Sequence, residues 1–367
     1  RRVIVATGAH ERPLVFANND RPGILLADAL RTFINRYGVT PGHNIVIATT
    51  GASAYQAALD AKAAGLFVTI VDYRRRDDIG EERVLATKAG IEILDNHTIL
   101  GSTGRSQVTG LMVAPMTASG GVGDARTLAC NAVGMSGGWT PVVHLVSQSR
   151  AKLRFDNEID AFVPGKANQA EQSAGACRGL YELAQCLADG FEAGGGPGAA
   201  PAAETVDVTG FEPVRAMPSN RVSVRDKAFV DFQNDVTAKD IKLAVQEGFQ
   251  SIEHVKRYTT TGMATDQGKT SNINALGIVA GALDLTPPDV GTTTFRPPYT
   301  PTTFGAFAGQ ARGAIFDPER ITATHDWAVA HDARFEDVGL WKRAWYFPQG
   351  AEKMHEAVQR ECRAVRE

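Results

Sequence analysis

The chain has 367 residues, more than one ordinary hydrophobic core holds, so we expect two or three domains. Hydrophobic residues make up 43% and charged residues 22%, which excludes a disordered or fibrous protein. The formal net charge of -3 argues against nucleic-acid binding, and no apolar run approaches the ~20 residues that cross a bilayer. Four scattered cysteines favour a reduced, soluble, cytoplasmic protein without a disulfide framework.

The first elements predict a nucleotide-binding type of domain. The apolar, β-branched residues 2–8 predict a buried strand of a parallel sheet, and residues 28–37 have the apolar spacing of a helix. A strand over 44–48, a helix over 53–64 and a strand over 67–71 follow. This βαβ crossover of roughly thirty residues is the elementary piece of a doubly wound domain.

The turn inside this crossover is poor in glycine. Residues 49–54 contain only Gly51, where a dinucleotide fingerprint has three glycines. The acid that closes the second strand is present as Asp72, and the arginines at 74–76 suit a 2′-phosphate. Because two glycines are missing, we favour a Rossmann-shaped unit that holds no cofactor at this turn over a working dinucleotide site.

Strands, linkers and a helical segment follow. The predicted strands, of which the first three form a meander, are residues 91–94, 98–101, 108–114 and 128–135. Gly, Pro and Ala in 194–218 and prolines in 286–303 predict two linkers. Between the linkers, Thr237 and Asp240 form a capping pattern for the first of two helices within 227–285.

Two similar turns, at residues 6–13 and 135–141, each end an apolar strand and precede a proline. This pair resembles flavoproteins with two dinucleotide-binding domains, in which the second domain is inserted into the first. The resemblance implies that residues 173–179 open a helix whose N-terminus faces the cofactor phosphates. Close packing of a helix on a sheet is an equally good explanation of the small residues there.

The most specific stretches are residues 228–272 and 291–300. They include Ala228-Phe-Val-Asp231, Glu253-His-Val-Lys256 and Gly291-Thr-Thr-Thr-Phe-Arg296. Both stretches closely resemble the alpha subunits of heterotetrameric sarcosine oxidases, and the resemblance covers essentially the whole chain. It implies that a nucleotide-binding glycine loop precedes Arg1. It also implies that most of an aminomethyltransferase-like, folate-binding domain follows Glu367.

The layout of 228–272 is also similar to a small [2Fe-2S] domain of related amine dehydrogenase subunits, in which four cysteines hold the cluster. Asp231, Gln233, Asp266 and Ser271 stand at the matching places, and none of them supplies the thiolate that cluster iron needs. We therefore expect a BFD-like domain that has lost its cluster, and no metal site.

The expected fold class is α/β, a Rossmann-type region followed by this small helical domain. The domains are expected to be residues 1–20 with 150–193 (first, NAD-binding domain), 21–149 (inserted Rossmann-like domain), 194–226 (linker), 227–285 (BFD-like domain), 286–316 (extended linker) and 317–367 (start of the folate-binding domain).

The resemblance also implies four cofactors: NAD on this chain, FMN at the interface with the beta subunit, FAD in the beta subunit, and tetrahydrofolate in the third domain. NAD contacts are expected from Thr7, Gly8, Gly175, Ala176, Gly179, Tyr181 and Leu183. The polar loop, residues 262–271, is expected to wall the FMN with Met263, Thr265, Gln267, Lys269, Thr270 and Ser271. The alternative for this loop is a capped helix start whose polar groups are satisfied locally.

The implied reaction is the oxidative demethylation of sarcosine by O2. Its products are glycine, hydrogen peroxide and either formaldehyde or 5,10-methylenetetrahydrofolate, and the complex includes beta, gamma and delta subunits. Because the amine is oxidised on the beta-subunit flavin in that family, we expect no catalytic residue in this chain. The alternatives are a subunit of an opine or other secondary-amine dehydrogenase, and a scaffold subunit that binds no cofactor.

Overall fold

The computed structural model describes residues 2–78, 80–204, 210–220, 226–297 and 300–367. It divides into two compact units, Arg1–Thr300 and Pro301–Glu367. Parts of both predicted linkers, 194–226 and 286–316, lie outside the described residues. So do two residues of the specific stretch 291–300. Within the described ranges, no helix combines the length and the apolarity that a bilayer crossing requires.

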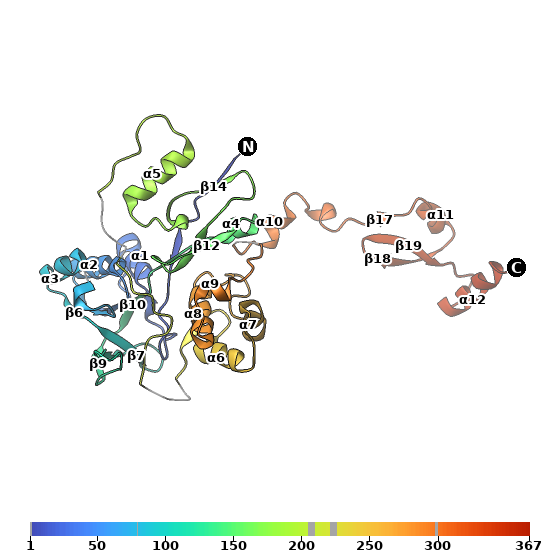
Figure 1. Ribbon diagram of the computed structural model, residues 1–367. Coiled ribbons are helices and arrows are strands. Elements are labelled where there is room, and N and C mark those ends of the chain that lie inside the picture. The colour runs from blue at the N-terminus through green and yellow to red at the C-terminus, as the bar shows by residue number, and fades with distance from the viewer. Residues whose placement is uncertain (1, 79, 205–209, 221–225, 298–299) are drawn as a thin grey trace. The chain divides into compact units, whose positions relative to one another are not determined.

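A parallel sheet of order β3-β10-β4-β5-β6 lies at the centre of the first unit. Its strands are β3 (Ile24–Leu26), β4 (Asn44–Thr49), β5 (Phe67–Asp72), β6 (Glu92–Leu94) and β10 (Ala132–Ser136). One face carries α1 (Ala27–Tyr37), α2 (Tyr55–Ala63) and α3 (Glu81–Lys88), as Figure 1 shows. The other face packs against an antiparallel meander, β7 (His97–Thr103), β8 (Gly110–Pro115) and β9 (Arg126–Ala129). The predicted βαβ crossover is confirmed, with its helix starting as the 3-10 turn η1 (Ala52–Ala54).

Two strand predictions in this region are wrong. β6 pairs in parallel with β5 and belongs to the central sheet, not to the meander. The predicted strand over 128–135 is two strands, β9 and β10, because the chain turns at Asn131. The Asn131 side chain accepts a hydrogen bond from the Asn44 amide at 3.0 Å, which anchors this turn to the start of β4.

Short paired strands surround the sheet. β1 (Val3–Val5) pairs in parallel with β14 (Glu171–Ser173), and β12 (Leu153–Asp156) pairs with β13 (Ala161–Pro164). The prediction that β1 is buried is wrong for most of its length. Val3 is 61% and Ile4 41% exposed, because only Val5 reaches the small core formed with Val146 and Ala151.

The prediction that residues 173–179 open an α-helix is also wrong. This segment forms the 3-10 turn η3 (Gly175–Arg178), which ends at Gly179 with a left-handed φ of 88°. The α-helix of this region, α5 (Leu183–Gly194), begins later. A left-handed glycine interrupts helical hydrogen bonding, so the small residues make a tight turn and not a helix start.

Residues 226–297 add a helical layer to the first unit. A hairpin of β15 (Phe229–Asp231) and β16 (Val236–Thr237) precedes α6 (Ala238–Gln246), α7 (Ile252–Thr259), α8 (Asn272–Leu283) and α9 (Pro287–Val290). Helices α6 to α8 share one core. The predicted cap is confirmed, since the Thr237 and Asp240 side chains form a capping box at the start of α6. α9 makes the start of the predicted extended linker helical.

The second unit is small and contains the sheet β17-β19-β18. Its elements are α10 (Phe304–Ala308), η4 (Gly313–Ile315), β17 (Arg320–Ile321), α11 (His325–Ala330), β18 (Arg334–Val338), β19 (Trp341–Tyr346) and α12 (Met354–Ala364). Two of its histidines pack on aromatic rings: His331 stacks on Trp327 with ring centroids 4.0 Å apart, and the His325 ring lies 4.8 Å from the Phe335 ring.

Candidate functional site

The two proline-containing turns lie side by side. β2 (Ala9–Glu11) pairs antiparallel with β11 (Trp139–Pro141), so the chain enters and leaves the parallel-sheet region through adjacent strands. The buried Arg12 guanidinium fixes this crossing by donating hydrogen bonds to the carbonyls of Trp139 at 2.8 Å and Asp160 at 3.0 Å. The pairing brings Glu11 and Trp139 to one place.

A cleft opens beside this crossing, and we call it the Trp139 cleft. Its volume of about 600 Å³ lies within the range of small-molecule sites. It is lined by Ala9, Glu11, Ala27, Asp28, Arg31, Ser53, Ala54, Gln56, Ala57, Trp139, Ala176, Tyr181, Glu182, Leu183 and Glu204. The cleft therefore joins the turn around η3 to the start of α2, two segments that are far apart in the sequence.

Three of the predicted NAD residues line the Trp139 cleft. Ala176 lies within η3, and Leu183, the first residue of α5, is 62% exposed. The Tyr181 hydroxyl donates a hydrogen bond to the Trp139 carbonyl at 3.3 Å, and burial raises the pKa of Tyr181 well above its ordinary value. Its phenol is therefore a neutral donor that binds the backbone of Trp139.

The other four predicted NAD residues are not among the described residues that line the cleft. The Thr7 hydroxyl donates to the Val142 carbonyl at 2.6 Å, and Gly8 has a left-handed φ of 74° in the turn before β2. Gly175 donates its amide to Asp189 at 2.7 Å. At Gly179, a side-chain β-carbon would lie 2.6 Å from Ile159, so this glycine permits close packing. Thr7 and Gly8 therefore shape the turn before β2, and Gly175 and Gly179 shape the turn around η3. Both turns border the cleft.

Sequence reasoning missed Glu11 and Trp139 as cleft residues. Glu11 is 5% exposed, and its carboxylate accepts the Asp28 amide at 2.9 Å at the start of α1. Burial raises the pKa of Glu11 to about 7, against the opposing effect of that hydrogen bond. Both residues lie in the two similar turns, residues 6–13 and 135–141, so the sequence did point to the segments that carry them. Only the β2–β11 register shows which side chains meet.

In the βαβ crossover, the turn between β4 and α2 is the place where a nucleotide would bind. Residues 210–212 of the chain itself occupy it. The Ala52 amide, at the start of η1, donates to the Gly210 carbonyl at 2.7 Å, and Glu212 donates its amide to the Thr50 carbonyl at 2.8 Å. Gly51 forms an antiparallel bridge with Phe211. Helix-start amides are the groups that would otherwise bind a phosphate, so residues 210–212 fill that position.

The acid at the end of β5 is also engaged internally. Asp72 is fully buried and accepts hydrogen bonds from the Tyr55 hydroxyl at 2.8 Å and from Arg74 Nη2 at 2.8 Å. Arg74 in turn contacts Glu82 at 3.0 Å. A ribose would have to displace these partners. This geometry supports the interpretation of a Rossmann-shaped unit that holds no cofactor at this turn.

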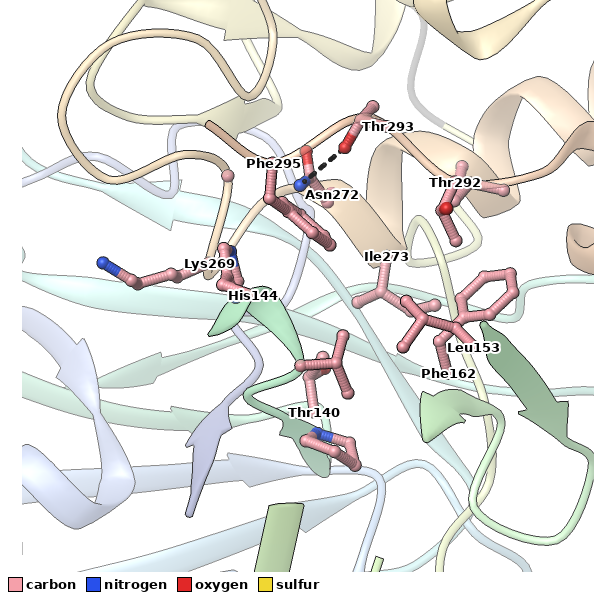
Figure 2. A pocket seen from close by; sticks show the side chains of 14 residues that line it. Thr140, His144, Leu153, Phe162, Lys269, Asn272, Ile273, Thr292, Thr293 and Phe295 are labelled. Carbon is pink, nitrogen blue, oxygen red and sulfur yellow. Dashed lines mark hydrogen bonds between the residues drawn. The ribbon is translucent and has the colours of Figure 1, made fainter. Parts of the chain in front are cut away.

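The polar loop lies against a second cavity, which we call the junction pocket (Figure 2). Lys269 and His144 line it from different segments; the His144 ring lies beside the Phe295 ring, and the Lys269 side chain extends away from the other labelled side chains. The His144 ring lies 4.0 Å from the Phe295 ring, and its Nε2 is 3.3 Å from the Gln267 carbonyl oxygen. Burial lowers the pKa of His144 to about 4 and also lowers the pKa of Lys269. At neutral pH the histidine is therefore uncharged.

The structure brings together the four residues at the expected cluster positions. The Gln233 amide donates to Asp231 at 3.0 Å, the Asp266 amide donates to the Gln233 side chain at 3.1 Å, and Ser271 Oγ is 3.5 Å from the Asp231 carboxylate. Hydrogen bonds thus connect these positions. The interpretation of this layer as a BFD-like domain without cysteines stays a prediction.

The predicted FMN residues of the polar loop differ in environment. Met263 and Thr265 are exposed, whereas Gln267, Lys269 and Thr270 are half-buried. Among these, Lys269 lines the junction pocket. Ser271 is buried and precedes α8, and its side chain makes no capping hydrogen bond to that helix. Other polar groups of the loop do bond locally, such as the Gln267 side chain to the Ala264 carbonyl, so a locally satisfied loop remains the alternative to the FMN wall.

One family model and several known proteins match this chain. Residues 225–310 match the family described as the sarcosine oxidase A3 domain. The alpha chain of the sarcosine oxidase of Corynebacterium sp. (strain P-1) is 42% identical over all of this chain, which covers 39% of that protein. One of the opine oxidase subunits of Rhizobium meliloti (strain 1021) is 23% identical over 84% of this chain and 76% of its own length.

The fold has a counterpart among solved structures. The L-proline dehydrogenase from P. horikoshii aligns with a TM-score of 0.54 and 17% identity, over 83% of this chain and 58% of that chain. At this level of identity the likeness concerns the fold alone. The chain spans about two fifths of the length of the sarcosine oxidase subunits that it matches.

Proposed function

We propose, from the premise that this chain belongs to the family of sarcosine oxidase alpha subunits, that it binds NAD and walls an FMN in a sarcosine-oxidising complex. The complex would oxidise sarcosine with O2 to glycine and hydrogen peroxide. The methyl carbon would leave as formaldehyde or as 5,10-methylenetetrahydrofolate. The beta subunit would carry FAD and the amine-oxidising centre, and gamma and delta subunits would complete the assembly.

The observation that carries the NAD proposal is the Trp139 cleft. It gathers Ala176, Tyr181 and Leu183 beside the indole of Trp139, and its volume suits part of a dinucleotide. The small Ala176 side chain leaves space for close approach of a ligand, and the Tyr181 and Trp139 rings offer stacking surfaces. These small and aromatic groups support the proposal, and Arg31 is the cation of a lining that also holds the carboxyl groups of Glu11, Asp28, Glu182 and Glu204.

Filling the cleft tests this assignment. The variant Ala176→Trp is expected to weaken NAD binding at least about tenfold, because the indole would occupy the space proposed for the ligand. NAD content of the purified complex and titration calorimetry measure the effect. Ala188→Trp, on the exposed side of α5, is the matched control and should leave NAD binding intact. Equal NAD binding by both variants would place the nucleotide elsewhere.

The FMN proposal rests on Lys269, which the polar loop holds at the junction pocket (Figure 2). An ammonium group and nearby hydroxyls suit a phosphate or the polar edge of a flavin ring. Residues of this loop would contact the FMN from the alpha side, while the beta subunit would hold it covalently. Residues 317–367, within the second unit, would begin the folate-binding domain, which would receive the one-carbon product.

Changing Lys269 or Thr270 to alanine is expected to reduce the FMN content of the complex, because less FMN would be held in place for its attachment to the beta subunit. A hydrogen bond to a charged group is worth about 1.5–3 kcal/mol, so the loss should be readily measured. The mass of the beta subunit with its attached FMN, measured by mass spectrometry, gives the FMN content separately from that of FAD. Lys242→Ala removes an exposed lysine of α6 and serves as the control. Full FMN content in the Lys269 and Thr270 variants would mean that the loop does not wall the flavin.

Membership of an opine-oxidising complex is the second candidate function. It is favoured by the match to one of the opine oxidase subunits, which extends over 84% of this chain. The amine pocket would lie in another subunit, so activity of the assembled complex on sarcosine and on opines distinguishes the two functions.

A further inference from the structure

One buried carboxylate connects the two ends of the polar loop. Asp231, at the end of β15, is 1% exposed. Its Oδ2 accepts the amide of Gly262, the first residue of the loop, at 2.7 Å, and lies 3.5 Å from the hydroxyl of Ser271, the last residue. Its Oδ1 accepts the amides of Gln233 and Asn234 at 3.0 and 2.9 Å. Both oxygens are therefore used: Oδ1 by the hairpin, and Oδ2 by the loop and by the Asn234 side chain at 3.2 Å.

The next side chains of the hairpin hold the middle of the loop. Gln233 Nε2 donates to the Thr265 hydroxyl at 2.5 Å, and Gln233 Oε1 accepts the Asp266 amide at 3.1 Å. Asn234 Nδ2 donates to the Met263 carbonyl at 3.4 Å. The turn after β15 thus contacts the loop at its start, middle and end.

The loop depends on this support because its own sequence favours other conformations. Ala264 and Gln267 have left-handed φ angles of 61° and 52°, a region that residues with a side chain rarely adopt. Met263, Ala264 and Thr265 are exposed, so burial contributes little to holding this part of the loop. Hydrogen bonds from the hairpin, centred on Asp231, offset the backbone preference.

We propose that Asp231 is a positioning residue, which orders the polar loop and so holds Lys269 at the junction pocket. It acts through the loop and touches no ligand. The proposal deepens the FMN assignment and rests on it for its functional consequence, whereas the ordering of the loop is tested independently of any cofactor.

The test is Asp231→Asn in the purified complex. An asparagine side chain keeps the shape but replaces one acceptor oxygen by a donor, which cannot bind the amides that now point at it. Hydrogen exchange measured by mass spectrometry should be roughly tenfold or more faster at the Gly262 and Asp266 amides. The flavin absorption band should shift or weaken while NAD content stays unchanged. Asp235→Asn makes the same change at an exposed position of the same hairpin and should alter none of these readouts.

The outcomes separate the two proposals. Unchanged exchange at Gly262 would overturn the positioning role of Asp231. Faster exchange with an unchanged flavin band would support the ordering role and contradict the FMN wall. If Asp231→Asn does not yield a folded complex, Gln233→Ala tests the same hairpin. Exchange should then be faster at Asp266 with Gly262 still protected, and unchanged exchange at Asp266 would overturn the proposal.

Discussion

Replacing Asp72 by alanine is expected to lower the free energy of unfolding by about 3–5 kcal/mol. Asp72 is fully buried, and Arg74 is 2% exposed beside it. Removing the carboxylate leaves the guanidinium buried with Glu82 as its remaining acidic partner and takes the acceptor from the Tyr55 hydroxyl. Urea unfolding followed by circular dichroism measures the change.

Two further variants identify the cause of this loss. Asp77→Ala removes an exposed carboxylate five residues away and should change stability by no more than about 0.5 kcal/mol. Arg74→Met in the Asp72→Ala background removes the uncompensated charge and should recover part of the stability. A loss below about 1 kcal/mol for Asp72→Ala would mean that this network contributes little to the parallel sheet.

Replacing Glu11 by glutamine is expected to stabilise the protein above pH 7 and to change how its stability depends on pH. Burial raises the pKa of Glu11 from 4.5 to about 7. Between these values the folded state binds more protons than the unfolded state, so the contribution of Glu11 to stability falls as pH rises. The difference is equivalent to about 3 kcal/mol. Glutamine does not titrate and keeps an acceptor for the Asp28 amide.

The difference in stability between Glu11→Gln and the unchanged protein should therefore grow from about pH 4.5 to pH 7 and then level off. Urea unfolding at several pH values measures it. Glu81→Gln, in the first turn of α3, serves as the control for loss of a carboxylate outside the cleft. If the difference in stability between the two proteins is constant across this pH range, burial does not raise the pKa of Glu11 as expected.

The sequence was sufficient for those parts of the fold that local patterns determine. The βαβ crossover around β4 and β5 was predictable because its apolar runs and its stop at Gly65 are local. The cap at Thr237 was predictable for the same reason. The exposure of Val3 and Ile4 was not, because an apolar strand carries no local sign of whether anything covers it.

The candidate site was only partly predictable because it depends on contacts between distant segments. The family resemblance implied Ala176 and Tyr181, but the place of Trp139 beside them depends on the pairing of β2 with β11. Phe211 lies in a stretch whose composition predicts a linker, and nothing in its local pattern indicates that it bridges to Gly51. The turn at Gly179 was misjudged because small residues favour both tight turns and close helix packing.

We propose above all that this chain holds a nicotinamide dinucleotide in the Trp139 cleft, within a complex that also holds flavin. The most direct measurement is mass spectrometry of the small molecules released from the intact purified complex, with iron measured alongside, for the unchanged chain and for Ala176→Trp. We predict NAD and flavin without iron in the unchanged complex, and flavin without NAD in the variant. Absence of NAD from the unchanged complex would contradict the claim and favour a scaffold role, and stoichiometric iron would favour a dehydrogenase subunit.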